Sequence, residues 1–197
     1  MTTTPDQERR RSFRVTDKIA LLLRFFPQEE VELAMQSFSA RRHEHGMMNM
    51  FLRNRDKHLP VMTAIQSRDP EVAAYLRYLE SKIDTIAGMM QIQELDLPSK
   101  PTHEVNLSAT GLRFLHDQSL QVDEVIEMEM LLFPSYALIP ALGKVVACEE
   151  VAANDPQQRF SVAVDFILLD DDDQDLLIKH NVSRQMHDLQ LSHENDS

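Results

Sequence analysis

The stretch from Asp69 to Gln93 constrains the fold most, because it combines a helix start signal with an unbroken apolar repeat. Asp69 is a good N-cap, and Pro70 suits the first helical position, where no backbone hydrogen bond is lost. The apolar positions then alternate spacings of four and three through Val72, Leu76, Leu79, Ile83, Ile86 and Met90. This a/d pattern predicts either a helix that assembles chains or a helix that packs on others of its own region.

The segment before this helix also has helical character. It begins behind Pro27 with acids that favour a helix N-terminus, namely Glu29, Glu30 and Glu32. Apolar residues then recur at helical spacing at Val31, Ala34, Met35 and Phe38. The pattern continues through residues 47–52, and Pro60 predicts a boundary before residues 61–65. Residues 28–96 are therefore predicted to form one helical region.

Short apolar runs with polar or proline punctuation lie on both sides of this region, as is typical of strands. They are residues 19–26, 103–108, 112–116, 125–133, 142–151 and 160–168. Six such strands can close a small barrel, which removes exposed edges. The four aspartates at 170–173 precede an apolar-periodic stretch and predict the start of a C-terminal helix. The expected class is α+β.

Two polar signatures predict a site for an anion and a purine. The first is an arginine cluster, Arg9, Arg10, Arg11 and Arg14. Guanidinium groups pair bidentately with phosphate and stack on flat rings. The second holds Asn106 and Ser108, which share one face if the segment is a strand, and Gly111, which permits a turn that other residues resist. Taken alone, the arginine cluster fits a solvated basic arm equally well.

Together the two signatures resemble the PilZ domain family, bacterial receptors for the second messenger cyclic di-GMP. Its hallmarks are an RxxxR motif, which maps onto Arg10 and Arg14, and a [D/N]xSxxG motif, which maps onto Asn106, Ser108 and Gly111. The resemblance implies a six-stranded antiparallel β-barrel with a C-terminal helix. Residues 1–27 and 97–192 would form the barrel domain with a flexible N-terminal arginine arm, and residues 28–96 would be an insertion between the first two strands.

The resemblance also implies a mechanism. Arg10 and Arg14, helped by Arg9, would contact phosphates and guanine faces of cyclic di-GMP. Asn106 and Ser108 would hydrogen-bond a guanine edge or a phosphate, and Gly111 would keep the turn compact. The arm would become ordered over the ligand, which is the expected output. Some relatives assemble through a helical insertion, so the resemblance favours a homo-oligomer held by the stripe of Val72, Leu76, Leu79, Ile83, Ile86 and Met90.

Composition argues against several other classes of function. The net charge of −12 disfavours DNA, RNA or anionic membranes as partners, because these require an extended basic face. No apolar run approaches the roughly 20 residues that span a bilayer, and no secretory segment opens the sequence, so we expect a cytoplasmic protein. The aspartate run lacks the spacing of a calcium loop, and His43 and His45 lie two apart on a helical stretch, so we expect no metal site.

Catalytic machinery is not apparent either, since the sequence has no nucleophile elbow and no phosphate-cradling glycine loop. The expected function is therefore a receptor or adaptor, not an enzyme, that converts cyclic di-GMP binding into contact with an unknown protein effector in motility, pili, biofilm or virulence control. The alternative is an oligomeric scaffold that binds no nucleotide. Seven of the eleven methionines lie in the insertion and give it an adaptable apolar surface for protein partners. A scaffold would tolerate removal of Arg10 and Arg14.

Overall fold

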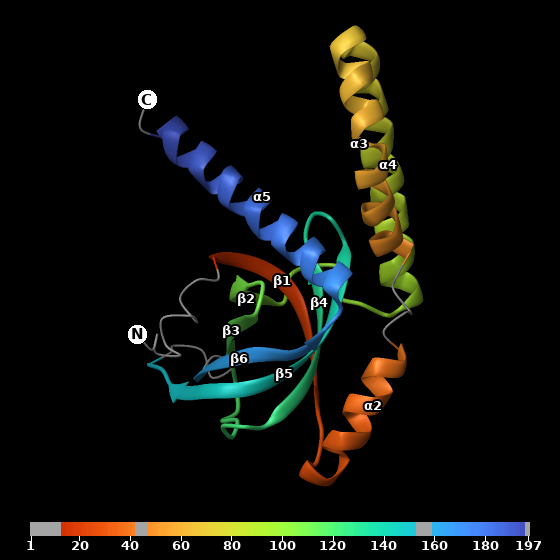
Figure 1. The fold of residues 1–197 in the computed structure, drawn as a ribbon. Helices are drawn as coiled ribbons and strands as arrows, with labels where there is room; N and C mark the ends of the chain where they lie inside the picture. The colour runs from red at the N-terminus through yellow and green to blue at the C-terminus, as the bar shows by residue number, and fades with distance from the viewer. Residues whose placement is uncertain (1–12, 42–46, 153–158, 196–197) are drawn as a thin grey trace, which may run out of the picture.

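A computed structural model describes residues 13–41, 47–152 and 159–195. Figure 1 shows a β-barrel from which a long helical hairpin and a C-terminal helix project. The elements in chain order are β1 (Arg14–Phe25), η1 (Gln28–Glu30), α2 (Val31–Arg41), α3 (Met47–Arg68), α4 (Pro70–Glu94), β2 (His103–Ser108), β3 (Gly111–His116), β4 (Val125–Leu132), β5 (Ala137–Glu150), β6 (Phe160–Leu169) and α5 (Asp171–Asn195). The predicted α+β fold, with an inserted helical region and a C-terminal helix, is confirmed.

The six strands form a closed barrel in the order β1-β2-β3-β6-β5-β4, and every pairing is antiparallel. Strand β1 closes it because its two halves have different partners. Its first half, from Arg14 to Ile19, pairs with β2, and its second half, from Ala20 to Phe25, pairs with β4. The insertion leaves the barrel after β1 and returns before β2, so adjacent strands flank it.

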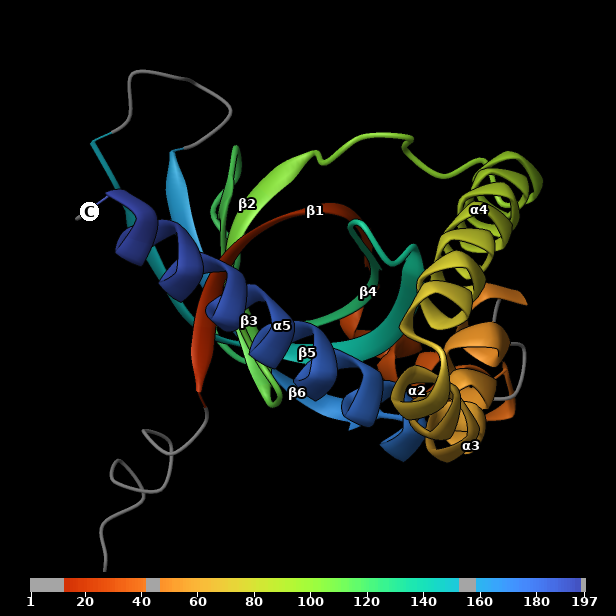
Figure 2. The same cartoon turned by 90° about the horizontal axis from the view of Figure 1, so that it is seen from above.

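The barrel interior is filled by alternate residues of the strands, including Phe114, Met128 and Ile139, each at most 2% exposed. Helix α5 lies across one end of the barrel, as Figure 2 shows from above. Its Leu176 and Leu177 belong to the same apolar cluster as the strand residues. The helix therefore completes the core and is not an appendage.

A buried charge on β1 fixes α5 in this position. Asp17 is only 3% exposed and points inward with its neighbours Val15 and Ile19. Its carboxylate oxygens lie 2.6 Å from Nε2 of His180 and 2.9 Å from Nε of Arg184, both on α5. A carboxylate is tolerated inside the barrel mouth because these two groups compensate its desolvation.

The helical hairpin of α3 and α4 follows the sequence signals with one exception. The Asp69 carboxylate accepts a 3.1 Å bond from the backbone N–H of Val72, and α4 runs to Glu94, as predicted. The predicted boundary at Pro60 is wrong, because α3 continues through this proline. Pro60 lies on the exposed face of α3, where the carbonyl that loses its helical partner can bond water.

The base of the hairpin sits against the turn between β4 and β5. A Cβ on Gly88 of α4 would overlap the ring of Tyr136, so only glycine allows this approach. Gln91 is 2% exposed, and its amide accepts from the backbone N–H of Met48 at 3.2 Å and donates to the carbonyl of Tyr136 at 3.1 Å. One side chain thus joins α4 to α3 and to the barrel.

Two strand starts differ from prediction by five residues. Strand β1 begins at Arg14, five residues before the predicted start at Ile19, so Arg14 belongs to the barrel and not to an arm. Strand β5 begins at Ala137 and contains Pro140, whereas a start at Leu142 was predicted. The pairing of β5 with β6 begins only at Ala141, so Pro140, which has no backbone N–H, costs no hydrogen bond to β6. None of the helices in the described parts of the chain is long and apolar enough to cross a membrane.

His103 at the start of β2 makes the stability of the barrel sensitive to pH. Burial, and secondarily the charge of His116, lower the pKa of His103 below its ordinary value of about 6.5. The unfolded chain therefore binds a proton at this histidine more readily than the folded state does. As a result, the free energy of unfolding falls as the pH drops through about 6.5. Denaturation at about pH 7.5 and about pH 5.5 should show a smaller loss in His103→Gln than in the unmodified protein. Exposed His58→Gln is the matched control, and equal losses in all three proteins would contradict this role of His103.

Candidate binding face on the barrel

Arg14, the last residue of the first polar signature, meets the second signature on the outer surface of the barrel. Within the pairing of β1 with β2, Arg14 lies opposite Ser108 and Thr16 lies opposite Asn106. Directly opposed residues of antiparallel strands place their side chains on the same face. The alternating partners Val15 and Asp17 point inward. The last arginine of the first signature is thus fixed beside the second, although the insertion separates them in sequence.

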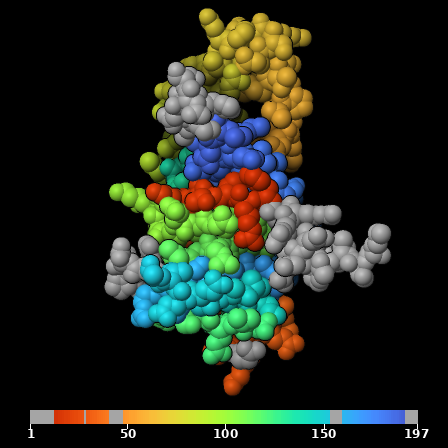
Figure 3. All heavy atoms as spheres, turned by 90° about the vertical axis from the view of Figure 1, so that its left-hand side faces the viewer, coloured from red at the N-terminus to blue at the C-terminus, as the bar shows by residue number. Residues whose placement is uncertain are grey.

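The same face continues onto β3 and β6. Asn106 lies opposite Arg113, which lies opposite Ala163, while Ser108 lies opposite Gly111, which lies opposite Asp165. In Figure 3, β1 in red and β2 and β3 in green lie side by side on the surface below α5 in blue. We define the outer face as Arg14, Thr16, Asn106, Ser108, Gly111 and Arg113.

Arg113 was not predicted as a site residue. Its side chain is 39% exposed and donates to Oγ of Ser161 at 3.0 Å, and its Nη1 lies 3.9 Å from Glu149. The neutral hydroxyl and the distant carboxylate leave donors of the guanidinium available. The sequence does contain one indication of its role: Arg113 lies two residues after Gly111, so the two residues share a strand face.

The Ser108 hydroxyl shapes the turn between β2 and β3. It donates to the carbonyl of Gly111 at 2.9 Å and accepts from the backbone N–H of Thr110 at 3.3 Å, and the residue is fully buried. The sharing of one face by Asn106 and Ser108 is as predicted. A direct contact of Ser108 with a ligand stays a prediction.

Gly111 is required for a reason other than the one predicted. None of the described glycines has a positive φ, so the turn needs no left-handed backbone at this position. Instead, a Cβ on Gly111 would overlap the carbonyl oxygen of Val164 on β6. Glycine therefore allows β3 and β6 to approach closely where Gly111 lies between Ser108 and Asp165.

The outer face supplies the chemistry of an anion and purine site in part. Arg14 is exposed and Asn106 is half-buried, so an arginine fork and an amide can both reach one ligand. Arg9, Arg10 and the predicted arm lie outside the described residues, as do His43 and His45. In the ranges that the structure describes, no cluster of histidine, cysteine or acidic side chains could hold a metal ion.

The predicted oligomerisation stripe lies on a face of α4 that α3 leaves uncovered. Ile83, Ile86 and Met90 are 55%, 59% and 54% exposed, and Val72 and Leu79 are also exposed, while Leu76 is half-buried. The positions of α4 that are buried are others, namely Ala73, Ala87, Gly88 and Gln91. Packing among the described residues therefore leaves most of the stripe exposed, which favours assembly over burial within its own insertion.

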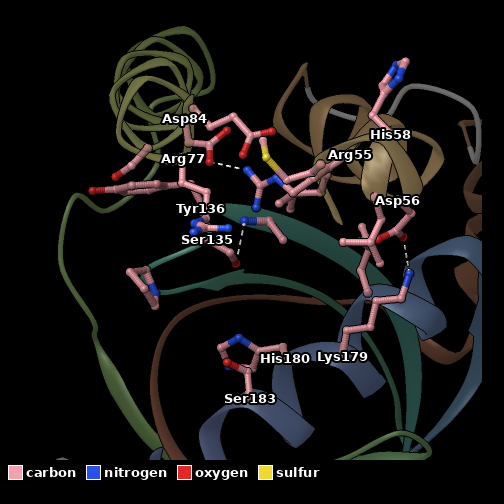
Figure 4. Close-up of a pocket in the computed structure, with 18 of the residues that line it drawn as sticks. Arg55, Asp56, His58, Arg77, Asp84, Ser135, Tyr136, Lys179, His180 and Ser183 are labelled. Carbon is pink, nitrogen blue, oxygen red and sulfur yellow. Dashed lines mark hydrogen bonds and ion pairs between the residues drawn. The ribbon is translucent and has the colours of Figure 1, made fainter. Parts of the chain in front are cut away.

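A groove of about 1000 Å³ separates the helical hairpin from α5 (Figure 4). Its floor is apolar and includes Leu52, Met62, Ile65, Tyr136 and Leu176. Its charges are largely paired, since Arg55 bonds Asp84 and Lys179 bonds Asp56. This surface suits an apolar protein segment better than a small anion, because Arg55 and Lys179 are paired with carboxylates and Arg77 bonds the Gln66 amide.

Comparison with known proteins agrees with this architecture. Residues 93–181 match the PilZ domain family, a stretch that covers β2 to β6 and the first part of α5. A protein from Xanthomonas campestris, described as a tetrameric PilZ domain self-assembled through an unusual helical bundle, is similar over 92% of both chains, with a TM-score of 0.51 and 12% identity. At that identity the likeness shows the fold alone.

A second solved structure is similar over a smaller part of the chain. The inhibitor of motility from Bacillus subtilis is similar over 45% of this chain and 43% of its own, with a TM-score of 0.38 and 16% identity. No curated protein matches the chain significantly.

The closed barrel, the strand-turn signature and the family match together define a domain of the PilZ class, whose members are binding and adaptor domains. The chain thus carries a PilZ domain at residues 93–181, and the structure places a helical insertion between the first and second strands of the barrel. The family match begins at the end of the insertion, so β1 with Arg14 joins the domain through the barrel pairing.

Proposed function

We propose that this protein is a cytoplasmic cyclic di-GMP receptor and adaptor that binds the nucleotide on its outer face. The observation that carries the proposal is the pairing of β1 with β2, which sets Arg14 opposite Ser108 and beside Asn106. An arginine fork recognises the phosphates or the guanine face, and the Asn106 amide matches the donor and acceptor pattern of a guanine edge. No cofactor is needed for this role.

In this proposal, Arg9 and Arg10 add to the positive charge that Arg14 provides and close over the ligand. Cyclic di-GMP carries about two negative charges, which offset the mutual repulsion of the arginines and form charge-assisted hydrogen bonds. Added salt should weaken binding because it screens these charges. The ordered arm then presents a changed surface to a protein effector in control of motility, pili, biofilm or virulence.

We include self-assembly through α4 in the proposed function. The exposed stripe on α4 supports it, as does the similar Xanthomonas campestris protein, which is described as assembling through a helical bundle. Burial of the stripe between chains would remove isoleucine and methionine side chains from water, which favours association.

Isothermal titration calorimetry with cyclic di-GMP tests the receptor role. Arg14→Ala and Asn106→Ala should each weaken binding, the former by about 10- to 100-fold, because a hydrogen bond to a charged group contributes about 1.5 to 3 kcal/mol. The double variant Arg10→Ala/Arg14→Ala should bind still more weakly. GTP is the control ligand.

Arg24→Ala is the matched control, because Arg24 is an exposed arginine at the opposite end of β1, where it lies 3.7 Å from Glu127. Its affinity should equal that of the unmodified protein. Equal affinities for Arg14→Ala and Arg24→Ala would reject the outer face as the site.

The scaffold alternative has its own support in the groove between the hairpin and α5, whose apolar floor fits a protein segment. The two functions differ in two observables. A scaffold would give no heat with cyclic di-GMP and would retain its protein partners in the Arg10→Ala/Arg14→Ala variant.

A further inference from the structure

The first turn of α5 contacts the loop of the strand-turn signature. The side-chain amide of Gln174 donates to the carbonyl of Ala109 at 3.0 Å. Ala109 lies between Ser108 and Thr110, whose own carbonyl accepts from the backbone N–H of Phe166 at 2.8 Å. A shift of this loop would therefore strain the two hydrogen bonds that join it to α5 and to β6.

Asp173, the residue before Gln174 on the same turn of α5, bonds the helical hairpin through α3. Asp173 is fully buried, and its Oδ1 accepts from Nδ2 of Asn49 at 3.0 Å and from Nη2 of Arg53 at 2.8 Å. Nη1 of Arg53 also lies 3.1 Å from Asp172. A buried carboxylate resists loss of such partners, because an uncompensated charge in the interior is costly.

The base of the hairpin is also bonded to the barrel, so the hairpin cannot move together with α5 without disturbing those bonds. The Asn49 side chain donates to the carbonyl of Leu138 at 2.7 Å and accepts from its N–H at 3.0 Å. Gln91 attaches α4 to the carbonyl of Tyr136 in the same way. A displacement of α5 would therefore strain the hydrogen bonds that hold the base of the hairpin. This would change the free energy of the hairpin's orientation relative to the barrel.

We infer that the first turn of α5 couples nucleotide binding on the outer face to self-assembly through α4. The route runs from the Ser108 loop through Gln174 and Asp173 to Asn49 and Arg53, and from there along the hairpin. The inference rests on the proposed function, since it requires both the ligand and the assembly. Coupling of this kind is reciprocal. If assembly changes the ligand affinity of each chain by a given factor, full occupancy by ligand changes the assembly constant by that factor raised to the number of chains in the assembly.

The test measures both sides of this linkage in the unmodified chain. Sedimentation analysis gives the dissociation constant of the assembly with and without saturating cyclic di-GMP, and titration gives ligand affinity for dilute and concentrated protein. Assembly is expected to change the ligand affinity of each chain by about fivefold or more, and saturating ligand is expected to change the assembly constant by that factor raised to the number of chains. Gln174→Leu and Gln174→Ala, which remove the donor to Ala109, should bring this factor close to one while assembly without ligand persists.

Gln185→Leu makes the same change on an exposed position of α5 and should keep the full coupling. Absence of ligand binding in the unmodified chain would reject the proposed function and the coupling with it. Binding and assembly that do not affect each other, or a chain that stays monomeric, would overturn the coupling while the receptor role stands. Undiminished coupling in both Gln174 variants would overturn the route through α5.

Discussion

Replacing Ile83 and Ile86 together with glutamate is expected to convert the assembled protein into a monomer. Both side chains are more than half exposed in the single chain and lie on the face of α4 turned away from α3. Full burial of an isoleucine stabilises an interface by about 1.5 to 3 kcal/mol. The variant loses this for two residues in every protomer and must also desolvate two carboxylates, so its dissociation constant should rise by several orders of magnitude.

Sedimentation velocity across a concentration series measures this effect. Thr63→Glu/Ser67→Glu is the matched control, because it adds the same two charges to exposed positions of the partner helix α3. The control should assemble like the unmodified protein, and circular dichroism should show equal helix content in all three. An Ile83→Glu/Ile86→Glu variant of unchanged mass would show that the stripe is not the interface.

Asp17→Ala is expected to cause the largest loss of stability. The substitution removes the carboxylate that His180 and Arg184 contact at 2.6 Å and 2.9 Å inside the barrel mouth. Breaking a buried ion pair by removing one partner costs about 3 to 5 kcal/mol, because the groups left behind lose the attraction that offset their desolvation. Helix α5 should detach more readily, and the barrel should unfold at lower denaturant concentration.

Chemical denaturation of Asp17→Ala beside Asp56→Ala isolates the effect of burial. Asp56 pairs with Lys179, also on α5, but both side chains are about half exposed. Its removal should cost at most about 1 kcal/mol, as is usual for surface pairs. Similar unfolding midpoints for the two variants would contradict a structural role for the buried pair.

Local signals explain which elements were predicted well. Helix α4 has a cap, a first-turn proline and a periodic stripe within its own sequence, so no distant contact is needed to locate it. The bounds of β2 match the prediction because its punctuation and its apolar alternation coincide. The barrel itself followed from the number of strands and from the family resemblance.

The misplaced elements depend on partners far away in the chain. The start of β1 was missed because Asp17 interrupts the apolar alternation, and its compensating His180 lies 163 residues further on. Pro60 and Pro140 read as breaks because the sequence does not show which backbone groups need a partner.

The candidate site was predicted by residue type but not by arrangement. Asn106 and Ser108 share a face, as their spacing indicates, whereas the placement of Arg14 and Arg113 beside them follows from strand register. Register depends on the whole barrel, so sequence spacing alone does not give it. The internal bonds of Ser108 and the contact of Gln174 with Ala109 likewise appear only in three dimensions.

A crystal structure of the protein with cyclic di-GMP would test the central claim most directly. We predict that the ligand lies on the outer face of β1, β2 and β3, with the Arg14 guanidinium on a phosphate or guanine face and the Asn106 amide on a guanine edge. Ligand bound instead in the groove between the hairpin and α5, or an outer face left empty at saturating ligand, would contradict the account.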